Sequence, residues 1–133
     1  MRSVWRHLAL CVWGVYWLLL FAVMHMPKPP GTRLVEHLGD KVVHACAYFL
    51  LAALGGWATW RRERRAGPGW FARWWLLYAV YAAADEILQS VVGRACQIGD
   101  WLADVIGATL ALLLVFALSY RKRQQHPGKL GDR

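Results

Sequence analysis

The stretch that decides the fold spans residues 101–120 and reads WLADVIGATLALLLVFALSY. It contains a single charged residue, Asp104. An α-helix rises about 1.5 Å per residue, so about 20 apolar residues cross the roughly 30 Å hydrocarbon core of a bilayer. This stretch is therefore long enough and apolar enough to form a membrane-spanning helix.

Three further apolar stretches of similar length precede it. The expected helices cover residues 8–26, 42–60, 72–92 and 101–120. Within them, the Asp, Glu, Lys, Arg and His residues are His25, His44, Arg73, Asp85, Glu86 and Asp104. A chain of 133 residues with 58% hydrophobic residues and nine Trp is too small to bury four such helices in water. The sequence predicts an all-α fold: one integral membrane four-helix bundle over residues 1–133, with a disordered polar tail at 121–133.

Basic residues are distributed unevenly along the chain. Eleven of the 16 Lys and Arg residues lie before the first helix, between the second and third, or after the fourth, and a twelfth, Arg73, lies at the start of the third helix. Four crossings place these segments on one side of the membrane, so the positive-inside bias predicts that both termini are cytoplasmic. The net charge of +8 is thus a topology signal, and no nucleic-acid partner is predicted.

Polar residues recur at helical spacing near one end of the expected helices. Asp40, His44 and Tyr48 are four residues apart and share a helix face, as do Asp100 and Asp104. In the third helix, Gln89 follows Asp85 by four residues and Glu86 by three, while Lys41 and Arg94 lie at the membrane rim. Charged groups within a bilayer are costly, so they are usually paired, turned to a cavity, or functional.

The helical rise gives the depth of each of these residues. His44, Gln89 and Asp104 lie about 6 Å from the outer helix ends, and Tyr48, Asp85 and Glu86 lie roughly 10–12 Å from them. This matching of depths predicts one outward-facing polar pocket between the second, third and fourth helices, with the first helix as a wall. The predicted ligand-binding residues are Asp40, Lys41, His44, Tyr48, Asp85, Glu86, Gln89, Arg94, Asp100 and Asp104.

A purely structural interpretation is also open, in which Lys41 and Arg94 pair with Asp85, Glu86 or Asp104 and lock three helices together. Five carboxylates against two fixed cations weigh against it, because excess buried acid must be protonated, solvated or met by a cation. A histidine among carboxylates suits a divalent metal. The sequence has no compact ligand motif, however, so no metal and no cofactor are predicted.

Three motifs in order resemble a known family. They are Asp40-Lys41-x-x-His44-x-x-x-Tyr48-x-x-Leu51, Asp85-Glu86-x-x-Gln89 followed by Gly93-Arg94, and Asp100-x-x-x-Asp104-x-x-Gly107. Together they resemble the VanZ-like family of bacterial membrane proteins, with Val92 where a proline is frequent and Asp104 where asparagine is common. The resemblance implies a multi-pass protein of the bacterial cytoplasmic (inner) membrane and the cell envelope. The founding member is associated with resistance to the glycopeptide teicoplanin.

Three hypotheses for function follow. The first is binding or modification of a membrane lipid or lipid-linked cell-wall intermediate, with Lys41 and Arg94 meeting phosphate or carboxylate groups. The second is an intramembrane hydrolase or transferase, with His44, Glu86 or Asp85 as candidate catalytic residues. The third is a small proton-coupled transporter, which as a homo-oligomer would use Asp85 or Glu86 as proton carrier. Confinement of the polar groups to the outer half weighs against transport, and the sequence leaves open whether the protein is an enzyme.

Overall fold

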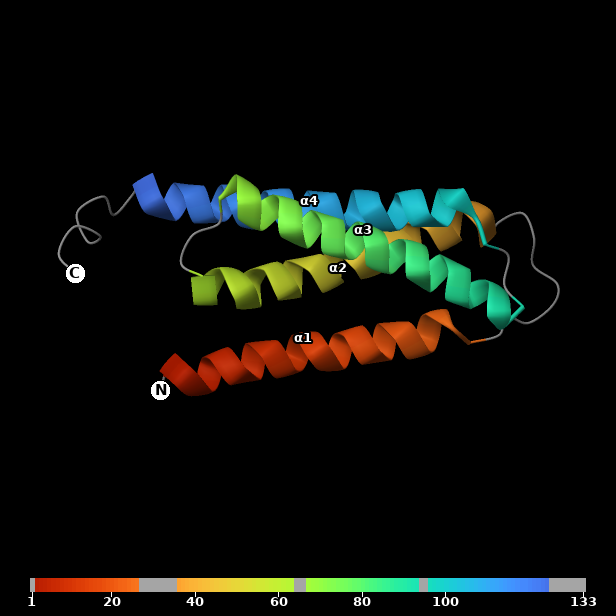
Figure 1. The fold of residues 1–133 in the computed structure, drawn as a ribbon, viewed down its shortest axis with the longest axis horizontal. Helices are drawn as coiled ribbons and strands as arrows, with labels where there is room; N and C mark the ends of the chain where they lie inside the picture. The colour runs from red at the N-terminus through yellow and green to blue at the C-terminus, as the bar shows by residue number, and fades with distance from the viewer. Residues whose placement is uncertain (1, 27–35, 64–66, 94–95, 125–133) are drawn as a thin grey trace.

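The computed structural model of the chain describes residues 2–26, 36–63, 67–93 and 96–124. It contains four helices: α1 (Arg2–Met24), α2 (Glu36–Glu63), α3 (Pro68–Val91) and α4 (Ile98–Gln124). The described residues contain no strand. The predicted all-α fold with four helices is therefore confirmed (Figure 1).

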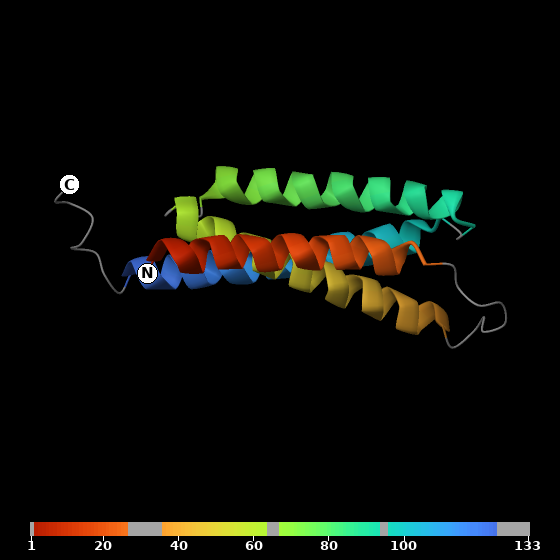
Figure 2. The same cartoon turned by 90° about the horizontal axis from the view of Figure 1, so that it is seen from below.

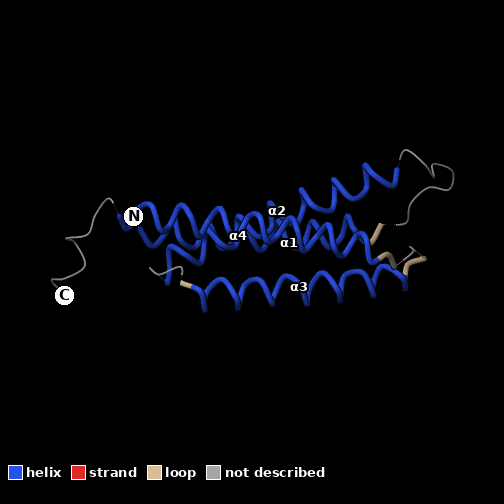
Figure 3. The backbone as a smooth tube through the Cα atoms, turned by 90° about the horizontal axis from the view of Figure 1, so that it is seen from above, coloured by secondary structure: helices blue, strands red, loops and turns tan. Residues whose placement is uncertain are grey.

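Successive helices run in opposite directions along the long axis of the molecule. The start of α1 and the end of α4 consequently lie at the same end of the bundle (Figure 1). At the opposite end, α1 and α3 finish while α2 and α4 begin, and we call this the polar end. The first turns of α2 diverge from the other helices there (Figures 2 and 3).

Three of the helices are long and apolar enough to cross a membrane. These spans are His7–Met24 in α1, Gly39–Thr59 in α2 and Ile98–Arg121 in α4. The 24-residue α3 is of similar length but carries Arg73, Asp85 and Glu86. Both of its carboxylate side chains are buried inside the bundle, at 1% and 3% exposure. The chain is a membrane protein by these features, and the crossing by α3 stays a prediction.

Most helix ends lie beyond their predicted bounds, whereas α1 ends at Met24 and α3 at Val91, slightly before the predicted ends at 26 and 92. Helix α1 begins at Arg2, α2 runs from Glu36 to Glu63, and α4 continues to Gln124. Residues 121–124, predicted as disordered tail, are therefore helical. Their composition explains this correction, because Arg, Lys and Gln are good helix formers and cations favour the negative end of the helix dipole. The predicted tail beyond Gln124, residues 27–35 between the first two helices, and Arg94 lie outside the described residues.

The third helix begins earlier than predicted, inside what the sequence suggested was a loop. Pro68 occupies its first turn, where the missing N–H costs no hydrogen bond and the fixed φ suits a helix. The helix ends at Val91, and Gly93 follows with φ of +80°, a left-handed conformation that favours glycine. This sharp reversal returns the chain toward α4.

Helices α2 and α4 form the closest pair in the bundle. A Cβ atom on Gly107 would collide with the carbonyl group of Ala45, so the two backbones nearly touch at this point. Ala103 and Ala111, one turn to either side, are also buried. Small residues allow this approach, which matters in a bilayer because lipid gives no hydrophobic drive for helix association. The close pairing fixes the side chains of α2 and α4 against one another.

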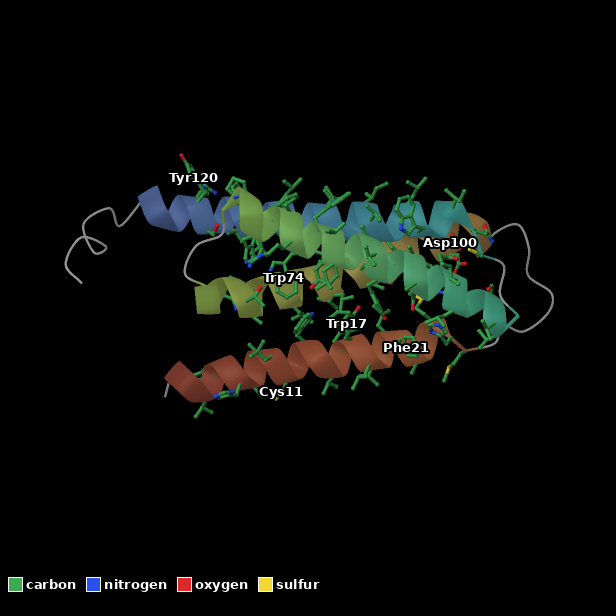
Figure 4. The ribbon with its side chains drawn as sticks, in the orientation of Figure 1. Cys11, Trp17, Phe21, Trp74, Asp100 and Tyr120 are labelled. Carbon is green, nitrogen blue, oxygen red and sulfur yellow. The ribbon has the colours of Figure 1, made fainter. Side chains whose placement is uncertain are left out.

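Helix α1 lies at the periphery of the bundle. Only 11% of its span is buried inside the protein, against 44% for the spans of α2 and α4, so most of it faces outward. Aromatic side chains attach it to α3: the ring centroids of Trp13 and Trp74 lie 5.7 Å apart, and those of Trp17 and Tyr81 lie 4.9 Å apart. Figure 4 shows Trp17 pointing toward the other helices, whereas Cys11 points away from them.

Candidate ligand site at the polar end

The rim of the polar end carries an ion pair between α2 and α4. Lys41 Nζ lies 2.7 Å from Asp100 Oδ1. The lysine side chain is 35% exposed, whereas that of Asp100 is 5% exposed. The cation therefore covers a largely buried carboxylate from the outer side. Figure 4 shows Asp100 at this end of the molecule.

One helical turn deeper, a second pair joins the same two helices. His44 Nδ1 lies 3.0 Å from Asp104 Oδ1, and both side chains are completely buried. Because a carboxylate oxygen accepts, the imidazole donates from Nδ1, which leaves Nε2 as the second functional atom of the ring. Asp40, the neighbour of Lys41, precedes His44 by four residues, and Asp100 precedes Asp104 by four residues. Each helix therefore advances by one turn from the rim pair to the deeper pair, so the two pairs lie in register.

Asp85 is the centre of the deepest layer. Its Oδ2 atom accepts hydrogen bonds from the Tyr48 hydroxyl at 3.3 Å and from Gln89 Nε2 at 3.2 Å. Its Oδ1 atom lies 3.7 Å from Nδ1 of His25, which lies in the turn that follows α1. That imidazole is held in place by the Phe21 carbonyl oxygen, 2.8 Å from Nδ1. Asp85 thus brings together groups from the turn after α1, from α2 and from α3.

Glu86 connects α3 to the segment that precedes α4. Its Oε2 atom accepts a hydrogen bond of 3.1 Å from the backbone N–H of Gln97. The Trp101 indole N–H donates in turn to the Ala79 carbonyl oxygen at 3.1 Å, tying α4 back to α3. These two bonds hold the polar end of α3 against the start of α4.

The structure brings together most of the residues singled out from the sequence. We call the following set the polar cluster: His44, Tyr48, Asp85, Glu86, Gln89, Asp100 and Asp104, each of which is buried. Asp40 and Lys41 lie at its rim and are partly exposed. The structural interpretation paired Lys41 with deeper carboxylates, but its described partner is Asp100.

Two participants were missed in the sequence. His25 reaches Asp85 from the turn that follows α1, and the first helix was expected to act only as a wall. Tyr81 was assigned no role, yet its ring lies 5.9 Å from that of Tyr48. The position of His25 near the outer end of the first apolar stretch was the available signal.

Several buried polar atoms of this region have no hydrogen-bond partner among the described residues. They are His25 Nε2, His44 Nε2, Tyr81 Oη, Asp85 Oδ1 and Asp104 Oδ2. Buried polar groups in native proteins are nearly always satisfied, and those left over at one place are a common feature of ligand sites. The arrangement therefore has spare hydrogen-bonding capacity.

An apolar groove lies beside the polar cluster, between α1 and α3. It has a volume of about 420 Å³ and is lined by Gly14, Trp17, Leu18, Phe21 and Tyr81. This volume falls within the usual range for small-molecule sites. Tyr81 belongs to both regions, because it lines the groove and its ring lies 5.9 Å from that of Tyr48 in the polar cluster.

The fold and the buried polar groups define a class: an all-helical membrane protein with a polar cluster inside one end of its bundle. Comparison with protein families identifies it further. The VanZ/LLP1 family model matches residues 7–119, which cover most of the chain, and the protein belongs to this family. No curated protein and no solved structure matches the chain.

Proposed function

We propose that this VanZ-family protein binds or modifies a lipid-linked component of the bacterial envelope. The hydrocarbon chain lies in the groove between α1 and α3, and the headgroup meets the polar cluster. The observation that carries the proposal is the junction at Tyr81. This residue lines the apolar groove, and its ring lies 5.9 Å from that of Tyr48 in the polar cluster. An apolar slot that ends at buried polar groups matches the two-part chemistry of a lipid.

The unpartnered atoms indicate the headgroup chemistry. Asp85 Oδ1 and Asp104 Oδ2 are acceptors without a hydrogen-bond donor among the described residues. A ligand that satisfies them must bring donors, which are the hydroxyl groups of a sugar or an amine. Lys41, at the partly exposed rim, is placed to meet a phosphate outside this inner layer. Lipid-linked sugars and amino sugars combine these features.

The membrane arrangement belongs to the same proposal. We infer that the chain crosses the bacterial inner membrane four times, with both termini cytoplasmic and the polar end outward. The start of α1 and the end of α4 lie at the same end of the bundle, which agrees with an even number of crossings (Figure 1). The excess of basic residues in the segments at that end supports the proposal that this end faces the cytoplasm. The polar cluster would then receive ligands from the outer leaflet.

Proton-coupled transport finds less support. The described buried polar groups away from the polar end are Thr59 and Ser119. Each hydroxyl donates to a backbone carbonyl of its own helix, at 2.7 Å to Gly55 and 2.6 Å to Phe116. Such bonds satisfy a hydroxyl locally and need no partner across the bundle. The ionisable buried groups that a proton relay requires are concentrated at one end.

Lipid binding by the purified full-length protein tests the proposal. The protein in nanodiscs is mixed with a polyprenyl-linked amino sugar, with the matching polyprenyl phosphate, or with phosphatidylglycerol, and bound lipid is counted by native mass spectrometry. Wild type should retain the amino-sugar lipid preferentially. Asp85→Asn should weaken this binding by about tenfold, because hydrogen bonds to a charged acceptor contribute about 1.5–3 kcal/mol.

A bulk substitution in the groove tests the site of the hydrocarbon chain. A Cβ atom on Gly14 would meet no atom within 4 Å, so Gly14→Leu projects into the groove and should weaken both polyprenyl lipids alike. Ala22→Leu is the matched control, because Ala22 is exposed on the same helix and does not line the groove. Equal lipid retention by wild type, Gly14→Leu and Asp85→Asn would contradict the proposal.

The same variants extend the test to cells. A deletion strain carrying wild type, Asp85→Asn or Gly14→Leu is scored for susceptibility to teicoplanin, with each protein checked for equal abundance in the membrane. If the lipid site serves the envelope, variants that lose lipid binding should fail to restore the wild-type susceptibility. Full rescue by both variants would separate the lipid site from this phenotype.

A further inference from the structure

We propose that Asp40, His44 and Asp100 form a divalent-cation site at the polar end, and that it takes Zn²⁺. One ligand atom from each residue lies within 4.8 Å of the others. One nitrogen and two carboxylate oxygens are ligands that Zn²⁺ accepts readily. The inference goes beyond lipid binding and does not depend on it, since the ion alone is sufficient for its test.

The buried imidazole is the observation that distinguishes this site from an ordinary acidic cluster. His44 is 0% exposed, and its Nε2 atom has no hydrogen-bond partner among the described residues. Its other nitrogen, Nδ1, is already bonded to Asp104. The nitrogen left for a ligand is therefore Nε2, and a completely buried imidazole with an open nitrogen beside two carboxylates points to a cation.

Asp104 supplies the outer support that metal-binding histidines usually have. Its Oδ1 atom lies 3.0 Å from His44 Nδ1 and accepts that N–H. A carboxylate in this position fixes the tautomer and the ring orientation, and it raises the basicity of the metal-binding nitrogen. Asp104 is thus a positioning residue for His44, one helical turn deeper than the ligand residues Asp40 and Asp100.

The ligand atoms must contract onto the ion. In a tetrahedral Zn²⁺ site with ligand distances of about 2.1 Å, two ligand atoms are about 3.4 Å apart. The three ligand atoms lie within 4.8 Å of one another, so they must draw together by up to about 1.4 Å. Asp40 is on the partly exposed rim of the site.

Lys41 is the competitor for this site. Its ammonium lies 2.7 Å from Asp100 Oδ1 and neutralises that carboxylate when no metal is bound. The lysine side chain is 35% exposed, so it can move outward when a cation takes its place. Loss of this ammonium should tighten metal binding, whereas loss of an ordinary structural ion pair would have no such effect.

Equilibrium dialysis of the untagged, full-length protein against Zn²⁺ tests the site, with bound metal measured by elemental analysis. Wild type should hold one Zn²⁺ per chain, and Mg²⁺, which prefers all-oxygen ligands, should not displace it. His44→Ala and Asp40→Asn should reduce binding to background. Asp104→Asn should weaken it about 10–100-fold, and Lys41→Met should strengthen it several-fold.

His7→Ala is the matched control, because His7 is exposed near the start of α1, at the other end of the bundle. Its Zn²⁺ binding should equal that of wild type. If His44→Ala does not fold, Asp40→Asn decides, since Asp40 lies on the rim. Equal Zn²⁺ binding by wild type and Asp40→Asn, or displacement of Zn²⁺ by Mg²⁺, would overturn the assignment. Because no lipid is added, failure here leaves the lipid-binding proposal to its own test.

Discussion

At the scale of single residues, substitution of His44 or Asp104 is expected to destabilise the protein strongly. Both side chains are completely buried, and each is the described partner of the other. Removing one leaves the other's polar atom buried without its bond, which costs more than the bond itself contributes. The pair therefore couples α2 to α4 whether or not an ion is bound.

A double-mutant cycle measures this coupling. His44→Ala and Asp104→Ala are each expected to destabilise the protein, while the double variant should be less destabilised than the two single effects predict. We expect a coupling energy of about 1–2 kcal/mol, since hydrogen bonds to charged groups are stronger than the average bond between membrane helices. Reversible unfolding in mixed detergent micelles, with a chelator present to exclude metal effects, gives the four free energies. A coupling near zero would contradict the prediction.

The residue pairs also show what the sequence can predict of the site. Four-residue spacing identifies a helix face and the helical rise gives depth, so both members of His44–Asp104 and of Tyr48–Asp85 were expected at matching depths. His25 gave no such signal, because one histidine in an apolar helix has no spacing pattern. Its approach to Asp85 depends on how α1 is rotated about its own axis, which side-chain packing decides.

At the scale of helices, Gly107 sets the distance between α2 and α4. The substitution Gly107→Ala would place a Cβ atom against the Ala45 carbonyl group and force two packed backbones apart. We expect a loss of about 1–3 kcal/mol in the free energy of unfolding, as for other overpacked cores. Gly14→Ala in α1 is the control, because its Cβ atom would meet nothing within 4 Å, and it should be neutral or up to about 1 kcal/mol stabilising. Equal unfolding free energies for the two variants would show that the close approach is not needed.

The number and approximate positions of the helices could be predicted from the sequence, but their lengths could not. The four helices follow from apolar stretches of about the membrane thickness, such as residues 101–120. Several of their ends, such as that of α4, extend further because the flanking residues, including Arg121, are good helix formers even though they are too polar for a bilayer core. Hydropathy measures the part of a helix that can lie in lipid, whereas backbone hydrogen bonding continues until the sequence stops it.

At the scale of the whole molecule, orientation in the membrane is the property on which the proposed function depends. Cys96 is exposed in the connection between α3 and α4, at the polar end, and Tyr120 is exposed near the far end of α4 (Figure 4). The proposed topology places these two residues on opposite sides of the membrane, with Cys96 outside. Only in this orientation can the polar cluster meet lipids of the outer leaflet.

Cysteine labelling of intact cells with a membrane-impermeant maleimide decides the orientation. In a background with Cys11→Ala and Cys46→Ala, Cys96 should react without lysis. When Cys96→Ala is added and Tyr120→Cys supplies the thiol, labelling should require permeabilised membranes, which also provide the control for intrinsic reactivity. The reverse pattern would turn the polar cluster toward the cytoplasm, where its lipid would have to come from the inner leaflet. Labelling of both positions in intact cells would show that α4 does not separate the two sides, which contradicts four crossings.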